Sequence, residues 1–295
     1  MNIQKSYQTE GPCLYLVPTP IGNLEDMTFR AVRILQEVDL ILAEDTRKTG
    51  VLLKHYAIKT RMMSFHEHSS QAEVEKWADY IHVGHSIALV SDAGMPLIND
   101  PGHPLVQALL AISLPVVSLP GANAATTALV ASGLPANTFT YYGFFPRNKT
   151  EQVQLLNMIG KREETAIFYE SPYRLKQSIQ QIDRVLGPET NIVIAREISK
   201  KFEEYLRGSC QELIDYFEKN ALKGECVLLL RPSRLVSHSK TQENSDLSYK
   251  DQVLALMDEE EISAKRAIKK VAQAMQVKKQ EVYAAYHDLN LDRKD

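Results

Sequence analysis

The sequence predicts an α/β protein with two doubly wound domains, in which strands and helices alternate, followed by a small C-terminal helical module. Three observations predict this fold class. Short apolar runs at residues 14–17, 38–43, 87–90 and 115–119 are separated by segments with helical periodicity. Several of these runs end in loops rich in glycine, proline and small polar residues. After Pro232 the alternating pattern gives way to polar sequence.

The domain limits follow from changes in composition. The first domain is predicted over residues 12–132 and the second over residues 136–232, on either side of a Gly-Leu-Pro break. Residues 233–248 contain five serines without helical periodicity, which is typical of a linker. Residues 249–290 are rich in Ala, Lys, Glu and Gln and are predicted to form the helical module.

Each element has a local reason. Thr28 is expected to cap a helix that runs to Leu35, because a threonine hydroxyl can accept a bond from a free N–H group of the first turn. Pro172 is expected at the start of another helix, since proline is tolerated in the first turn. The other predicted helices are 72–83, 124–132 and 151–159, and the other predicted strands are 138–144, 165–169, 192–195 and 226–230.

The overall composition excludes several classes of protein. The 295 residues are 44% hydrophobic and 24% charged with a net charge of −3, so any nucleic-acid site must be a local basic patch. Cys13, Cys210 and Cys226 are far apart and odd in number, which favours neither a disulfide framework nor a zinc site and fits a reducing compartment. Because no targeting segment or membrane-length apolar run is seen, we expect a cytoplasmic protein without membrane contact.

The loop at residues 91–102 is the main candidate for a ligand site. It follows the strand 87–90 directly and contains two glycines and two prolines, which turn the backbone sharply and leave room for a bound molecule. Ligands of open α/β sheets bind beyond the carboxyl ends of strands. The alternative is a simple connector, but the loops at residues 18–23 and 120–123 have the same character and favour a site.

Common catalytic motifs are missing from the sequence. No two of the 13 glycines are two residues apart, which excludes the G-x-G-x-x-G dinucleotide motif, and the phosphate-binding G-x-x-x-x-G-K-[ST] motif is also missing. No G-x-S-x-G elbow is present. His66 and His68 offer at most a loose pair of metal ligands in a polar stretch, so we expect a solvated loop there and no metal.

Five sequence blocks together resemble the ribosomal RNA small subunit methyltransferase I family of the tetrapyrrole methylase superfamily. They lie in the family's order within residues 12–232, so the match is more specific than any one motif. The blocks are Pro18-Thr19-Pro20-Ile21-Gly22-Asn23-Leu24, Glu44-Asp45-Thr46-Arg47, Ser91-Asp92-Ala93-Gly94-Met95-Pro96 with Asp100-Pro101-Gly102, Pro120-Gly121-Ala122-Asn123-Ala124, and Phe168-Tyr169-Glu170-Ser171-Pro172-Tyr173-Arg174. One departure is Met95, where the family often has threonine; a loop that offers mainly backbone should tolerate it.

The resemblance implies a fold and an activity. It implies two α/β domains of the tetrapyrrole methylase type with S-adenosylmethionine bound between them, and a homodimer. It also implies 2'-O-methylation of a cytidine in the decoding centre of 16S rRNA, within the 30S subunit. The residue types agree, because S-adenosylmethionine carries a sulfonium cation and no phosphate. Its site therefore needs small residues, backbone groups and one or two carboxylates, which these loops contain.

The resemblance also implies a set of donor-binding residues. Asp92 would face the donor, and the residues after Pro120 and Gly121 would offer backbone groups. Asp92 could alternatively cap its own turn, and Ala195 could simply be packed in the core. The expected donor-binding residues are Pro18, Asp92, Met95, Ser118, Asn123, Ala124, Tyr169, Ala195 and Glu225, of which Ser118 and Glu225 are the weaker candidates.

The acceptor chemistry leaves several candidates open. A ribose 2'-hydroxyl is a poor nucleophile, so an enzyme either supplies a base or mainly aligns the reacting atoms. Asp45, Asp100 and Glu170 lie at predicted strand ends and are candidate catalytic residues, and Glu44 lies beside them. Arg47 would hold a phosphate next to the target nucleotide or form an ion pair with Asp45 or Glu44.

The C-terminal module has a predicted basic face. Six basic residues and two acidic ones lie between residues 261 and 281, and an apolar stripe runs from Ile262 to Met275 with Ser263 as the expected cap. A solvated helix face is the ordinary meaning of such a pattern, and contact with RNA is the functional alternative. The candidate RNA-binding residues are Lys265, Arg266, Lys269 and Lys270.

Two other functions stay open at this point. A methylase of a small tetrapyrrole would use the same scaffold, although the basic tail and the Glu44-Asp45-Thr46-Arg47 block argue against it. A protein of another class, which binds RNA without catalysis, would also keep the fold. The identity of any general base is not predictable from the sequence alone.

Overall fold

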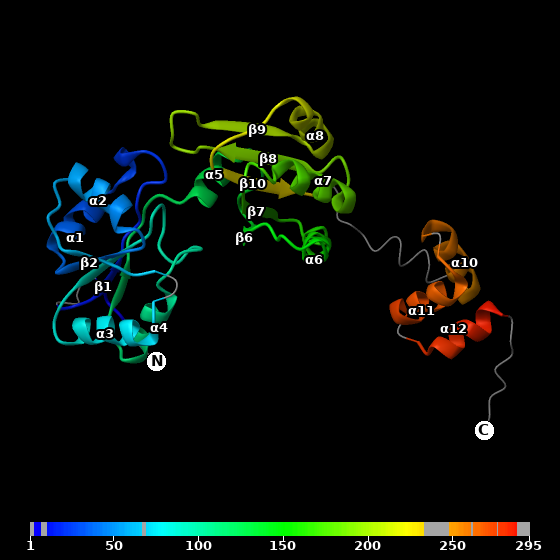
Figure 1. The fold of residues 1–295 in the computed structure, drawn as a ribbon, viewed down its shortest axis with the longest axis horizontal. Helices are drawn as coiled ribbons and strands as arrows, with labels where there is room; N and C mark the ends of the chain where they lie inside the picture. Colours follow the sequence, from blue (N-terminus) through cyan, green and yellow to red (C-terminus); the bar gives the residue numbers. More distant parts are fainter. Residues whose placement is uncertain are drawn as a thin grey trace, which may run out of the picture. The chain divides into compact units, whose positions relative to one another are not determined.

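The computed structural model describes residues 3–6, 11–66, 69–232, 248–260, 262–275 and 277–287. They belong to two compact units, residues 1–233 and residues 234–295. The described residues of the first unit form two five-stranded sheets with helices, and those of the second form three helices (Figure 1).

The first sheet is parallel throughout and has the strand order β3-β2-β4-β1-β5. The chain moves outward from β1 to β2 and β3, returns to β4 beside β1, and then crosses to β5. The carboxyl ends of β1 and β4 therefore form the switch point where such sheets bind ligands. The strands are β1 (Leu14–Leu16), β2 (Leu40–Ala43), β3 (Met62–Ser64), β4 (Ile87–Val90) and β5 (Val116–Ser118).

Helices cover both faces of the first sheet, which confirms the predicted doubly wound arrangement. Side chains alternate along β2, so that Ile41 and Ala43 pack with α1 and α2, whereas Leu40 and Leu42 pack with α3 and α4. All four residues of β2 are buried, as expected for a strand covered on both sides. The helices are α1 (Phe29–Glu37), α2 (Thr46–His55), α3 (Gln71–His82) and α4 (His103–Ala111).

Side-chain caps fix the starts of these helices. Thr28 is the N-cap of α1, as predicted, and its hydroxyl oxygen accepts a bond from the Ala31 N–H at 3.0 Å. At α3, Ser70 and Glu73 form a reciprocal capping box. Because each cap satisfies N–H groups that the first turn leaves free, the entry to each helix is set locally.

The second sheet is mixed and has the order β6-β7-β10-β8-β9. β6 and β7 are parallel, whereas β10 runs antiparallel to both β7 and β8, and β9 runs antiparallel to β8. The predicted α/β character is confirmed, but the winding differs from a wholly parallel sheet because the last strand enters between β7 and β8. The strands are β6 (Phe139–Phe144), β7 (Thr165–Glu170), β8 (Asn191–Arg196), β9 (Glu204–Ser209) and β10 (Cys226–Arg231).

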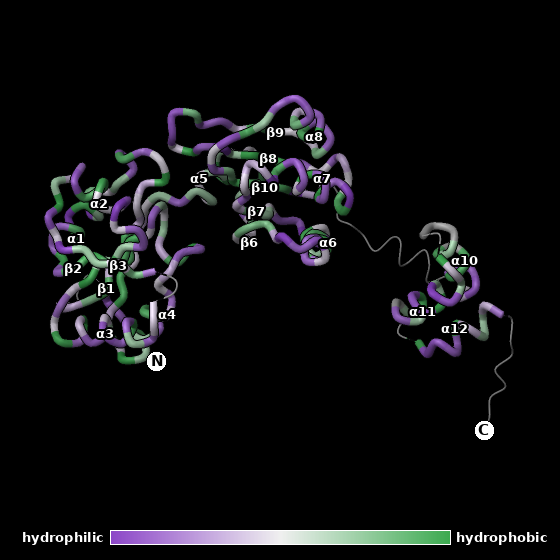
Figure 2. The backbone as a smooth tube through the Cα atoms, viewed as in Figure 1, coloured by the Kyte–Doolittle hydropathy of each residue, from purple (hydrophilic) through white to green (hydrophobic). Residues whose placement is uncertain are grey.

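One face of the second sheet packs against α6 (Lys149–Ile159), α7 (Leu175–Leu186) and α8 (Cys210–Lys219). The other face packs against α5 (Ala124–Ser132), through Ala125, Ala128 and Leu129. The sequence order places α5 after the first sheet, yet its buried residues belong to the second. Figure 2 shows hydrophobic stretches along the central strands of this sheet. The domain limit at residue 132 stays a prediction.

Several local expectations need correction. The helix expected from Pro172 begins at Leu175, with Arg174 as its N-cap, because residues 171–174 form a turn. The short strands β3 and β9 were not predicted, since neither has a continuous apolar run: β9 reads Glu-Tyr-Leu-Arg-Gly-Ser. Residues 233–247 of the expected linker lie outside the described residues.

The second unit contains α10 (Tyr249–Glu260), α11 (Ala264–Ala274) and α12 (Lys279–Tyr286). Its small core includes Val253, Ile268, Val271 and Val282. Ser263 is the N-cap of α11 by position, but its side chain makes no capping bond; its carbonyl oxygen accepts the N–H of Arg266 at 2.9 Å instead. Among the described residues, no helix is both long enough and apolar enough to span a membrane.

We expect Gly102→Ala to destabilise the protein more than Gly84→Ala. Both glycines have positive φ, +129° and +116°, but a Cβ at residue 102 would lie 2.5 Å from Leu89 Cδ2, whereas residue 84 has nothing within 4 Å. Because Leu89 is buried and cannot move freely, the difference in unfolding free energy should be about 1–3 kcal/mol in chemical denaturation. Equal losses in the two variants would contradict this account of the loop.

Candidate active site

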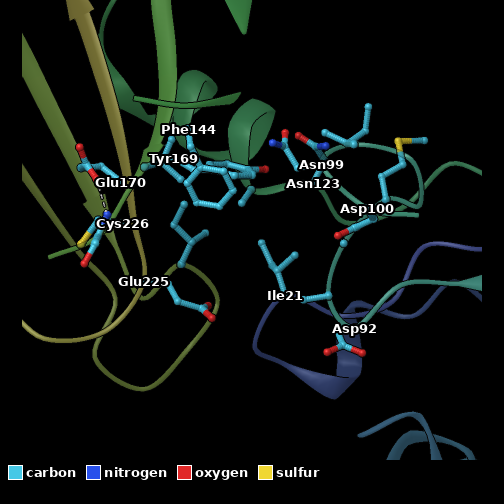
Figure 3. A pocket seen from close by; sticks show the side chains of 18 of the residues that line it. Ile21, Asp92, Asn99, Asp100, Asn123, Phe144, Tyr169, Glu170, Glu225 and Cys226 are labelled. Atoms are coloured by element: carbon cyan, nitrogen blue, oxygen red, sulfur yellow. Dashed lines mark hydrogen bonds between the residues drawn. The ribbon is translucent and has the colours of Figure 1, made fainter. Parts of the chain in front are cut away.

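A cavity of about 520 Å³ is lined by residues of both sheets in the first unit (Figure 3). The first sheet contributes the loop after β1, the end of β2 and the loop after β4, and the start of α5 adds Asn123 and Ala124. The second contributes the ends of β6 and β7 and the turn that leads into β10. The cavity therefore lies where the fold class predicts a ligand site, at the carboxyl ends of β1 and β4.

Backbone pairing holds two of these loops together. Thr19 and Gly94 exchange both N–H···O bonds, at 2.9 and 3.0 Å, between the loop after β1 and the loop after β4. The Thr19 hydroxyl also donates to the Ser91 carbonyl oxygen at 3.0 Å, and the Ser91 hydroxyl donates to that of Gly94 at 3.2 Å. The two loops thus form one rigid floor under the cavity.

The loop after β4 is strained and contacts the second sheet. Leu97 and Asn99 have φ values of 71° and 67°, a region that side chains other than glycine rarely adopt. Tyr141 of β6 donates its hydroxyl to Asn99 Oδ1 at 2.6 Å, and Gly143 leaves room for the same side chain. Strain of this kind persists only where surrounding contacts fix the backbone, and it is often found at functional sites.

Asp92 is fully engaged at the edge of the cavity. Its Oδ1 accepts the N–H of Asp45 at 3.0 Å, and its Oδ2 lies 2.7 Å from Lys48 Nζ. Asp45 in turn pairs with Arg47 at 2.7 Å, and this guanidinium holds the pKa of Asp45 well below its ordinary value. Asp92 therefore connects the carboxyl end of β4 to the first turn of α2.

Asp100 lies in the cavity wall with an unusual electrostatic environment. Burial raises the pKa of its carboxyl to about 6, and the charges of Glu44 and Asp92 add to the rise, while a hydrogen bond with Ser91 opposes it. In Figure 3 its carboxyl group points into the cavity.

Glu170 is buried and its oxygens are occupied. It accepts the Ser178 hydroxyl at 2.6 Å and the Ser171 N–H at 2.8 Å, and lies 3.3 Å from Arg174. The same arginine donates to the carbonyl oxygens of Phe145 and Pro146. This arrangement explains why Glu and Arg lie four residues apart in the sequence block: they fix the turn between β7 and α7.

Aromatic side chains form the wall on the second sheet. Tyr169 lies edge-on to Tyr141 and Phe144, with ring centres 5.1 and 5.9 Å apart. Burial raises the pKa of both tyrosines, so their hydroxyls stay protonated near neutral pH. Glu225 also lines the cavity. Its carboxylate pairs with Lys200 Nζ at 2.8 Å, and the Glu225 side chain is 80% exposed.

The structure brings most of the candidate donor-binding and catalytic residues together. Eight of them line the cavity: Asp92, Met95, Asp100, Asn123, Ala124, Tyr169, Glu170 and Glu225. The others do not line it. Pro18 is buried beneath Gly121, Ser118 is exposed, Ala195 is fully buried against α5, and the Asp45–Arg47 pair lies on the outer side of Asp92.

Other lining residues were not predicted. Ile21, Asn99 and Ile198 lie in loops whose sequence pattern marks a turn but not its direction, and Phe144 ends a strand. The sequence signal that could have identified these residues is their position at the ends of strands.

Of the histidine pair considered for a metal, His68 lies outside the described residues. The candidate RNA-binding residues Lys265, Arg266, Lys269 and Lys270 are all exposed on α11.

Comparison with known proteins identifies the family. A family model described as Tetrapyrrole (Corrin/Porphyrin) Methylases matches residues 13–214. Proteins named Ribosomal RNA small subunit methyltransferase I are similar over nearly the whole chain. The one from Streptococcus pyogenes serotype M1 is 47% identical over 98% of this chain and 100% of its own length. That of Bacillus subtilis is 45% identical over 93% and 94%, and that of Vibrio cholerae 41% identical over 96% and 97%. The chain belongs to the ribosomal RNA small subunit methyltransferase I family.

Solved structures show that this methyltransferase family shares its fold with more distant enzymes. A uroporphyrin-III-C-methyltransferase from Thermus thermophilus has a TM-score of 0.54 at 20% identity, covering 76% of this chain and 95% of its own. The same enzyme complexed with S-adenyl homocysteine has a TM-score of 0.52 at 18% identity, over 74% and 97%. A diphthine synthase has a TM-score of 0.58 at 11% identity, over 76% and 91%. These likenesses confirm the tetrapyrrole methylase type of fold.

Proposed function

We propose that the protein transfers the methyl group of S-adenosylmethionine to the 2'-hydroxyl of a cytidine in the decoding centre of 16S rRNA. The observation that supports this most is the similarity to relatives named rRNA methyltransferases, which spans 93–98% of this chain. The structurally similar uroporphyrin and diphthine enzymes cover only 74–76% of it. The rRNA-methylating relatives therefore also account for the C-terminal part.

The cavity fits the proposed donor. Its volume of about 520 Å³ suits a small-molecule ligand. Five carboxylates line it, which favours the sulfonium and ammonium cations of S-adenosylmethionine, and the glycine-rich phosphate motifs that a nucleotide would need are missing from the sequence. Asp92, Met95, Asn123, Ala124 and Tyr169 are the residues proposed to hold it.

The residues of this chain would mainly orient the reactants. When bound, the donor supplies an electrophilic methyl group on sulfur. The paired loops after β1 and β4 keep the floor of the cavity fixed, and the rings of Tyr169 and Phe144 contact each other in the opposite wall. Fixed geometry of this kind lowers the barrier of a two-substrate reaction by holding the acceptor oxygen in line with the methyl group.

Methyl transfer to 30S subunits tests the function directly. With radiolabelled donor, we expect label in 16S rRNA and none in 23S rRNA of 50S subunits, which serve as the control. Nuclease digestion should then locate the label in 2'-O-methylcytidine. Label that appeared only in a porphyrinoid would favour a small-molecule methylase, and no label in any acceptor would favour a non-catalytic RNA-binding protein.

Asp92→Ala should weaken S-adenosylmethionine binding at least about tenfold, or about 1.4 kcal/mol, by calorimetry. Loss of the carboxylate removes a favourable charge and frees the backbone of Asp45 and the side chain of Lys48. Lys48→Met serves as the matched control, since it breaks the same ion pair but keeps the carboxylate, and its affinity should change less than threefold. An unchanged donor affinity in a folded Asp92→Ala variant would show that this residue is not part of the donor site.

The C-terminal unit is proposed to contact RNA. Lys265, Arg266 and Lys269 are exposed on the side of α11 away from Ile268 and Val271, which belong to the small core. Basic side chains on a helix can bind phosphates without reading bases.

The homodimer and the cytoplasmic location expected from the sequence stay predictions. Light scattering would measure the number of subunits.

Replacing Lys265, Arg266 and Lys269 with glutamine in the full-length chain should weaken 30S binding and flatten its salt dependence. Each lost phosphate contact should reduce the log–log slope by roughly 0.7–0.9. Donor affinity should not change, which makes it the internal control. Deleting residues 240–295 should act in the same direction. A variant with unaltered slope and 30S affinity would assign these residues to an ordinary solvated face.

A further inference from the structure

A second hollow in the first unit has a volume of about 160 Å³ and shares Asp92 with the cavity. It is formed by the loop after β1, by α2 and by the first residues of the loop after β4. The two loops also form the floor of the cavity, where Thr19 pairs with Gly94. The hollow and the cavity therefore adjoin each other and have one wall in common.

The size and lining of the hollow limit what it can hold. Sites that enclose a whole small molecule measure roughly 300–1,000 Å³, so a hollow of about 160 Å³ takes only one part of a larger molecule. Leu24, Val51 and Leu52 give it apolar walls, whereas Lys48 and Asp92 bring an ammonium and a carboxylate. A flat ring with polar edges, attached to a chain that stays outside, matches this combination.

The proposed reaction requires such a ring beside the donor. In a nucleotide the base is attached to ribose carbon 1', which is bonded directly to the carbon that carries the 2'-hydroxyl. When this hydroxyl meets the methyl group of a donor in the cavity, the base must lie in a space that adjoins the cavity. Proteins that recognise single-stranded RNA bind bases that are splayed out of their stack. The hollow at Asp92 meets both requirements.

Two exposed cations stand on the first turn of α2, where the helix borders the hollow. Lys48 Nζ lies 2.7 Å from Asp92 Oδ2, and Arg47 pairs with Asp45 at 2.7 Å. The hydrogen bond and the charge of Asp92 raise the pKa of Lys48, so its ammonium keeps its charge. An ammonium has three N–H donors and the bond to Asp92 uses one, so Lys48 can also donate to a nucleotide oxygen.

We infer that this hollow binds the base of the target nucleotide, with the ring against Leu24, Val51 and Leu52 and with Lys48 donating to the nucleotide. The inference rests on the function proposed above and adds the position of the acceptor to it. The ribose then lies at the shared wall, and its 2'-hydroxyl reaches the donor in the cavity. Because the hollow takes a single ring, it favours a pyrimidine over the two fused rings of a purine.

Val51→Trp tests the inference by filling the hollow. Val51 is 67% exposed, so a larger side chain there does not disturb the core. Val83→Trp is the matched control, since Val83 is 71% exposed at the end of α3 and lines neither space. Val51→Trp should lower kcat/KM for 30S subunits at least about tenfold, and the control less than about twofold. Donor affinity by calorimetry should stay within about threefold of the wild type in both variants.

The identity of the target base gives an independent readout. With the wild type, 30S subunits that carry adenosine in place of the methylated cytidine should react at least about tenfold more slowly, because a purine does not fit the hollow. Val51→Ala widens the hollow and should reduce this difference at least about threefold, whereas Val83→Ala should not change it. A merely structural role of Val51 would alter both rates alike. Equal wild-type rates on the two bases would contradict a hollow that takes one ring.

Lys48 is tested by removing and restoring its charge. Lys48→Met should raise the KM for 30S subunits at least about threefold, because the nucleotide loses a donor. Lys48→Arg keeps a cation at the same position and should restore most of the wild-type KM. An unchanged KM in Lys48→Met would show that this side chain does not contact the acceptor.

The outcomes separate the acceptor site from the donor site and from the proposed function. A kcat/KM of Val51→Trp within about threefold of the wild type would show that the hollow does not hold the base. A loss of donor affinity as large as the loss of kcat/KM would assign the hollow to the donor and also overturn the inference. A wild-type enzyme that methylates no 30S subunits would instead contradict the proposed function. Wild-type transfer with an unaffected Val51→Trp would leave that function standing and refute the acceptor site alone.

Discussion

The pairing of Thr19 with Gly94 is the constraint on which the rest of the site depends. Two backbone bonds tie the loop after β1 to the loop after β4, at the point where the parallel sheet changes direction. Helices leave these strands on opposite faces, so the sheet alone would leave a gap between the loops. The pairing closes this gap, and the loop after β4 can then extend across to Tyr141 of the second sheet.

The cavity shows that residues of one chemical type divide their roles according to their partners. Glu170 and Asp92 have bonds to fixed donors on both carboxylate oxygens, and they hold a turn and a helix start in place. Asp100 is instead partly buried and lies near the negative charges of Glu44 and Asp92, so its pKa rises. A sequence block that contains several carboxylates therefore does not reveal which of them is bonded to fixed donors on both oxygens. That distinction requires the positions of the neighbouring groups in the folded structure.

The elements that could be predicted from the sequence are those that depend on interactions between residues close together in the chain. Apolar runs predicted most strands, Thr28 predicted its cap, and small residues after strands predicted the loops of the cavity. The antiparallel entry of β10 was not predictable, because strand direction within a sheet depends on pairing with distant segments. The same holds for Ala195, which packs against α5 instead of lining the cavity, and for Asn99, whose partner Tyr141 is 42 residues away.

Charge explains why the donor and the acceptor need different surfaces. Five carboxylates line the cavity, and three of them form ion pairs with Lys48, Arg174 and Lys200. The charges of Glu44 and Asp100, for which no ion pair is seen among the described residues, attract a small cation and repel the phosphates of RNA. A chain with a net charge of −3 gains no general attraction to RNA either. Under the proposed function, the binding energy for the acceptor would then come from local basic surfaces outside the cavity, such as the exposed face of α11. In that case the cavity would need to admit only a single ribose, which is neutral apart from the phosphates that flank it.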